Sequence, residues 1–292
     1  NSLTISENGE CAALVGYGEK WKGGEVVFFE TGNGTVKWNY SFETRARDAV
    51  LSSDGSHLLF TTDPDYDEDG ISENGTVYLF NRDGEMLWNY TDEPYIHAID
   101  MSDDAENIII SKNYGSERSD VILLDGDGSI VWSYQVDNWV ESLKLTSDGE
   151  KVALGIRSTG VNEVRMLDGD GIFLWNYTFG RADWVEYTYI SDDGKYVVVS
   201  VGGGHAEYNR TYVFDSAGTE LWNHTFGNVV RSQWIDVSSS GEYIVLFETF
   251  NKFYLFETDS LPHAFLEGKK EKIQDLLKKE SVKIVCQNEL FL

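Results

Sequence analysis

Hydrophobic and polar residues alternate along most of the chain, in short segments separated by turns rich in Asp, Ser and Gly. In Leu174-Trp175-Asn176-Tyr177-Thr178 the alternation has a period of two, as in a β-strand with one buried face. The apolar run Val197-Val198-Val199 indicates a strand buried on both faces. The pattern therefore predicts many short strands joined by tight turns, with no crossover helix between them.

This succession of strands and turns recurs about every 46 residues. Each copy has an early turn such as Ser53-Asp54-Gly55 and a last strand that carries an aromatic residue. These aromatic residues are Trp38, Trp88, Trp132, Trp175, Trp222 and Phe265. Four-stranded repeats of this length are typical of β-propellers, in which each repeat forms one blade. We therefore predict an all-β, six-bladed β-propeller of four-stranded antiparallel blades, with the tryptophans packed between neighbouring blades.

The repeat places the propeller over residues 1–268, followed by a lysine-rich tail over 269–292 that carries a short helix and strand. The predicted blades span approximately 2–42, 43–92, 93–136, 137–180, 181–227 and 228–268. Two roles for the tail stay open. It either clasps the seam of its own ring or docks a neighbouring subunit, its lysines meeting the acidic body of that molecule.

The segment from Gly75 to Trp88, GTVYLFNRDGEMLW, resembles the repeat of pyrroloquinoline-quinone-type propellers. The Ser-Asp-Gly turns resemble those of archaeal cell-surface propellers, and the resemblance extends over all six copies. It implies a fold and no particular activity. Quinoprotein dehydrogenases of that family have an adjacent cysteine pair, whereas Cys11 and Cys286 lie near opposite ends here, so no quinone is expected. These two cysteines are instead candidates for one disulfide that ties the tail to the body.

The composition limits the classes of partner that we expect the protein to bind. The formal net charge is −27, with 23 basic against 50 acidic residues, so the clustered basic side chains that bind nucleic acid are scarce. No run of about 18 apolar residues occurs, and we expect no membrane-spanning helix.

N-glycosylation sequons are more frequent than chance predicts, which favours an extracellular or cell-surface location. They begin at Asn33, Asn39, Asn74, Asn89, Asn176, Asn209 and Asn223. Four of them directly follow a repeat tryptophan, in the strand expected at the outer edge of a blade. A glycan there would be accessible and would block pairing between sheet edges.

Polar and aromatic side chains are expected where each blade's innermost strand begins, at the mouth of the channel. Candidates for a ligand site there are Arg47, His97, Glu141, Glu186 and Gln233. Candidates for contacts with a sugar or a protein at the rim are Arg45, Tyr95, Trp139, Trp184 and Arg231. The alternatives are a ring of solvated or mutually paired polar groups, and aromatic residues partly buried under loops. Glu141 and Glu186 are also candidates for an acid/base pair of the kind that cleaves glycosides.

One acidic loop has the beginning of a calcium-binding pattern. Asp65, Asp67 and Asp69 alternate and are followed by Gly70, and Glu73 supplies a further carboxylate nearby. Calcium binding and a solvated acidic loop both stay open.

Together these observations predict a non-catalytic, glycosylated cell-surface propeller that serves as a structural, adhesion or assembly module, including assembly into a filament or surface layer. Its partners would be another protein or further copies of itself, with carbohydrate as an alternative ligand. The alternative function is a propeller enzyme, quinoprotein-like or carbohydrate-active, that uses the channel mouth.

Overall fold

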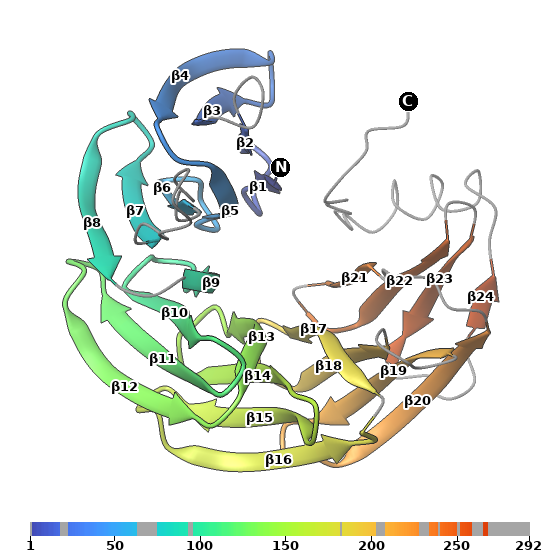
Figure 1. Ribbon diagram of the computed structural model, residues 1–292. Helices are drawn as coiled ribbons and strands as arrows, with labels where there is room; N and C mark the ends of the chain where they lie inside the picture. The colour runs from blue at the N-terminus through green and yellow to red at the C-terminus, as the bar shows by residue number, and fades with distance from the viewer. Residues whose placement is uncertain are drawn as a thin grey trace. The chain divides into compact units, whose positions relative to one another are not determined.

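In the computed structural model, the regular elements formed by the described residues are β-strands (Figure 1). The structure describes residues 2–17, 23–62, 75–92, 96–181, 183–202, 208–227, 234–238, 240–249, 252–258 and 265–267. The strands form six four-stranded sheets. Within each sheet, strands that follow one another in the sequence are neighbours. All neighbouring strands are antiparallel, so each sheet is a meander built from one repeat of the sequence. The chain divides into two compact units of three sheets each.

The first unit contains strands β1 to β12. Its first sheet comprises β1 (Ser2–Ile5), β2 (Cys11–Tyr17), β3 (Gly24–Glu30) and β4 (Thr35–Phe42). The second comprises β5 (Ala46–Leu51), β6 (His57–Thr62), β7 (Gly75–Asn81) and β8 (Met86–Asp92). The third comprises β9 (Ile96–Met101), β10 (Asn107–Tyr114), β11 (Arg118–Asp125) and β12 (Ile130–Val136).

The second unit contains strands β13 to β24. Its first sheet comprises β13 (Trp139–Leu145), β14 (Lys151–Arg157), β15 (Asn162–Asp168) and β16 (Phe173–Phe179). The second comprises β17 (Trp184–Ile190), β18 (Tyr196–Gly202), β19 (Tyr208–Asp215) and β20 (Glu220–Gly227). The third comprises β21 (Trp234–Val237), β22 (Tyr243–Thr249), β23 (Lys252–Glu257) and β24 (Phe265–Glu267), and is described chiefly by its backbone pairing.

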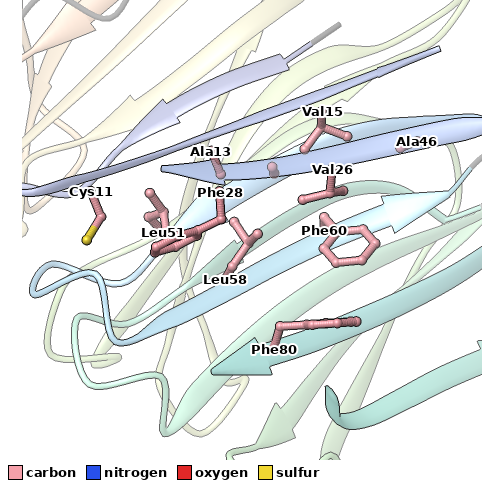
Figure 2. Close-up of a cluster of buried hydrophobic side chains, with 11 residues drawn as sticks. Cys11, Ala13, Val15, Val26, Phe28, Ala46, Leu51, Leu58, Phe60 and Phe80 are labelled. Atoms are coloured by element: carbon pink, nitrogen blue, oxygen red, sulfur yellow. The ribbon is translucent and has the colours of Figure 1, made fainter. Parts of the chain in front are cut away.

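Successive sheets within a unit pack face to face, because the middle strands of each sheet bury side chains on both faces. On β6, Leu58 and Phe60 pack with Phe28 of the preceding sheet, whereas Leu59 packs with Ile108 of the following one. Figure 2 shows the first of these clusters, with side chains from β2, β3, β5, β6 and β7. Alternate side chains of a strand point to opposite faces of its sheet, so one strand covered on both faces contributes side chains to two cores.

The first turn of each repeat closes on a residue in the left-handed region of backbone conformation. These residues are Gly9, Gly55, Ala105, Gly149, Gly194 and Gly241, with φ between 58° and 74°. In each turn the amide of this residue donates to a carbonyl three residues earlier, as from Gly55 to Ser52 at 2.9 Å. Glycine therefore recurs at the end of these turns because it adopts the left-handed conformation without steric cost.

The repeat tryptophans connect each sheet to a turn of the next one. Trp38 Nε1 donates to the Arg82 carbonyl at 3.1 Å, and Trp88 Nε1 donates to the Gly126 carbonyl at 2.8 Å. Trp175 Nε1 makes the same bond in the second unit, to the Ser216 carbonyl at 3.1 Å. The prediction that these tryptophans pack between neighbouring sheets is confirmed for all three.

The tail over 269–292 lies outside the described residues, so its two predicted roles stay predictions. Within the described part of the chain, no helix is long and apolar enough to cross a membrane.

Candidate functional site

Arg47 and His97 are the second residues of β5 and β9, the first strands of two successive sheets in the first unit, and the structure brings them together. Arg47 Nη2 lies 3.0 Å from His97 Nδ1. Because a guanidinium group only donates hydrogen bonds, Nδ1 accepts this bond and a neutral imidazole carries its proton on Nε2. Arg45, just before β5, is exposed. This end of the first unit therefore carries two arginine side chains and a histidine side chain.

A second polar group, which the sequence did not single out, lies at the ends of β8 and β10. Lys112 Nζ is 2.5 Å from Asp92 Oδ2, and the Lys112 side chain is only 6% exposed. Tyr90 donates its hydroxyl hydrogen to the same oxygen at 2.8 Å. Burial lowers the pKa of Lys112, but hydrogen bonds to Asp92 and Tyr114 outweigh it, so the pKa is raised overall. Burial and Asp92 raise the pKa of Tyr90 in turn. Lys112 and Asp92 therefore form an ion pair in the folded state, and Tyr90 donates a hydrogen bond to the same carboxylate.

In the second unit Glu141 and Trp184 are connected through Arg157. The Arg157 guanidinium forms a salt bridge with Glu141 at 3.3 Å and lies over the Trp184 ring, 4.0 Å from its centroid. Arg157 therefore covers one face of the indole, the surface on which a sugar would stack. Trp139, which pairs with Arg157 in the strand register, is half-buried.

Glu186 and Glu141 both lie near the phenol of Tyr187. Burial raises the pKa of Tyr187, and the two carboxylates raise it further. The structure thus brings the predicted pair of glutamates into one neighbourhood. The salt bridge to Arg157 holds the Glu141 carboxylate in place, as suits a binding group.

Several predicted site residues lie outside the described residues. They are Gln233, Tyr95, Arg231, the calcium candidates Asp65, Asp67, Asp69 and Glu73, and the sequon at Asn74. Among the residues that the structure describes, no group of three or more His, Cys, Asp or Glu side chains is placed to hold a metal ion. Calcium binding by the acidic loop stays a prediction.

Four sequon asparagines are exposed on the fourth strands of their sheets. Asn39 is on β4, Asn89 on β8, Asn176 on β16 and Asn223 on β20. The Ser or Thr two positions later is also exposed in each of these sequons, because alternate residues of a strand share one face. Asn33, in the turn before β4, is exposed as well.

The sequon at Asn209 is the exception, and the prediction that it is a glycan acceptor is wrong for the folded protein. Asn209 is only 5% exposed and its partner Thr211 is fully buried. Both lie on β19, the third strand of its sheet, between β18 and β20. An asparagine side chain buried to this degree leaves no room for an oligosaccharide.

The predicted Cys11–Cys286 disulfide stays a prediction, because only one of its two cysteines is among the described residues. Cys11 is a free thiol, 0% exposed, and packs in the core cluster between the first two sheets (Figure 2). Its sulfur lies against the turn at Gly55. Burial raises the pKa of the thiol, so Cys11 stays protonated and unreactive in the fold. Cys286 lies outside the described residues.

Comparison with known proteins identifies the fold. No protein-family model and no curated protein matches the sequence. Among solved structures, hydrazine synthase of Kuenenia stuttgartiensis superposes with a TM-score of 0.67 at 14% identity, over 89% of this chain and 76% of that one. The β-propeller domain of Myceliophteria thermophila Cps50 (Swd1) superposes with a TM-score of 0.63 at 14% identity, over 91% of this chain and 85% of that one. Similarity at this level of identity shows a shared β-propeller fold and no shared activity.

Proposed function

We propose that the chain is an extracellular or cell-surface, N-glycosylated, six-bladed β-propeller that acts as a non-catalytic binding or assembly module. The observation that carries the proposal is the exposed sequon on the outer strands of four sheets. An N-linked glycan is bulky and lies on the surface of a folded protein, so its asparagine must be exposed. The strands β4, β8, β16 and β20 meet this requirement.

The position of these sequons has a physical advantage for a protein outside the cell. An edge strand presents unpaired backbone groups that invite pairing with another chain. A glycan on Asn176, for example, would cover the edge of β16, a strand whose own side chains carry no charge. Glycosylation would therefore keep these edges from pairing.

The side chains near the start of each sheet's first strand support binding as the molecular role. In the first unit, Arg47 and His97 lie together at this end, and Arg45 beside them is exposed. In the second unit, Arg157 joins Glu141 and Trp184 into a fixed, partly exposed surface of charge and aromatic rings. Arginine and tryptophan are enriched in contacts that carry binding energy between proteins.

Mass spectrometry of single-site variants tests the proposal. Each of Asn39→Gln, Asn89→Gln, Asn176→Gln and Asn223→Gln, secreted from a glycosylating host, is expected to lose the mass of one glycan. The matched control is Asn209→Gln, which removes a buried sequon and is expected to lose none. Equal masses for the wild-type protein before and after enzymatic deglycosylation would contradict the proposal.

A further inference from the structure

The outer strand of the third sheet, β12, differs from the other outer strands. Its sequence IVWSYQV has Ser133 where β8 and β16 have the sequon asparagine, in MLWNYTD and FLWNYTF. No charged side chain occurs within β12. The strand is nevertheless an edge, since it ends its sheet and pairs with β11 on one side (Figure 1).

Each of the other outer strands with described side chains carries something that opposes edge pairing. The strand β4 has Lys37, and β8 ends in Asp92, while Glu220 begins β20. The neutral β16 has its sequon at Asn176. Charges and bulky groups on an edge are the common means of preventing pairing with another sheet. The strand β12 has neither.

The exposed side chains of β12 are apolar or uncharged. Ile130 is 56% exposed and Val131 is 57% exposed at the start of the strand. Apolar residues are exposed at the same repeat position of β8 and β16 as well, with Leu87 at 47% and Leu174 at 44%, so β12 differs from these strands in lacking a charge and a sequon. Ser133 and Gln135 are exposed and uncharged. A register shift precedes the tryptophan in every one of these outer strands, including β12, so this irregularity does not distinguish it.

We propose that β12 is a docking edge for β12 of a second copy of this chain, the two strands pairing antiparallel across a two-fold axis. In that arrangement Ile130 and Val131 of each copy lie against the second half of the other strand. One self-complementary edge is enough to build such a dimer and close it. The part of this argument that concerns the missing sequon rests on the proposed glycosylation.

Charge favours a second copy over an unrelated basic partner. Two chains of formal charge −27 repel each other, and the repulsion is smallest where the facing segments are neutral. A basic partner would be attracted to the acidic parts of the surface and not to this neutral strand. Because added salt screens the repulsion between the two bodies and leaves the apolar contact, the dimer is expected to tighten as the salt concentration rises.

Analytical ultracentrifugation of the full chain tests the proposal. The wild-type protein is expected to be a dimer at micromolar concentration, and Val131→Lys is expected to weaken it by at least about tenfold, because each copy then places an ammonium group in a neutral contact. The matched control is Leu174→Lys, at the same repeat position on β16, where the exposed leucine also precedes a tryptophan. The control is expected to leave the dimer unchanged.

A second variant gives β12 the sequon that it lacks. Ser133→Asn combined with Gln135→Thr creates the sequon found on the other strands. Protein from a glycosylating host should then be monomeric, while the same variant from a host without N-glycosylation should still dimerise. A monomeric wild type at every salt concentration, or equal losses for Val131→Lys and Leu174→Lys, would overturn the proposal. A wild type that lacks glycans but loses its dimer only with Val131→Lys would refute the proposed glycosylation and support the β12 contact.

Discussion

The contact between Trp38 and the turn at Gly84 predicts that a single added methyl group is costly. Gly84 has φ of 86°, and a Cβ added there would lie 2.8 Å from Trp38 Cγ. The indole cannot easily move away, because it stacks with both Phe28, at 5.2 Å between ring centroids, and Phe80, at 5.6 Å. Its Nε1 is also bonded to Arg82 in the same turn. Gly84→Ala should therefore strain the backbone and overpack the contact between two sheets.

The expected cost follows from these two effects. An alanine in the left-handed region costs about 1 kcal/mol, and forcing a methyl group into a packed contact adds about 2 kcal/mol. Gly115→Ala is the matched control, because Gly115 has φ of 66° and no atom lies within 4 Å of the point that an added methyl group would occupy. Gly84→Ala should thus lower the free energy of unfolding by about 3 kcal/mol, against about 1 kcal/mol for the control.

Urea denaturation followed by circular dichroism measures both values. Gly128→Ala repeats the test at the next sheet, where a Cβ would lie 2.8 Å from Trp88 Cδ2. Equal destabilisation by Gly84→Ala and Gly115→Ala would refute the reasoning, since only the backbone term would then matter.

Three further predictions concern buried polar groups. Asp92→Asn should lower the free energy of unfolding, measured by urea denaturation, by about 2 kcal/mol, because it leaves a buried ammonium group without its carboxylate. Lys112→Met should cost less, and the reverse order of the two variants would contradict this prediction. Cys11 should resist iodoacetamide in the native protein and react in urea, as read by peptide mass, and rapid native labelling would show that the thiol is accessible. Burial and the bond to Glu220 raise the pKa of Tyr177 to about 12 from 10.0, so the folded state retains a proton that the unfolded chain loses first. Stability should therefore fall between pH 10 and pH 12, with a smaller fall in Tyr177→Phe, and identical pH profiles for the two proteins would contradict the assignment.

The repeat made the strands and their turns predictable, because each depends on local signals. The two-residue alternation set the faces of β16, and the Ser-Asp-Gly turns set the left-handed residues. Ala105 occupies the same left-handed position as the glycines, with φ of 58°, so the backbone geometry is preserved even where the residue type changes.

Contacts between sheets were less predictable, because they join residues about one repeat apart through three-dimensional packing. Arg157 carried no sequence signal that it would connect Glu141 with Trp184. The sequon at Asn209 had the same local pattern as the others, and only the packing of the folded chain buries it. Cys11 likewise gave no sign in the sequence that its thiol lies inside a core.

The most direct test of the account is the intact mass of the protein isolated from its own cells, before and after enzymatic removal of N-glycans, with the modified residues mapped by peptide mass spectrometry. We predict a loss of mass and glycans at Asn39, Asn89, Asn176 and Asn223, with Asn209 unmodified. An unchanged mass, with every one of these asparagines unmodified, would contradict the central claim.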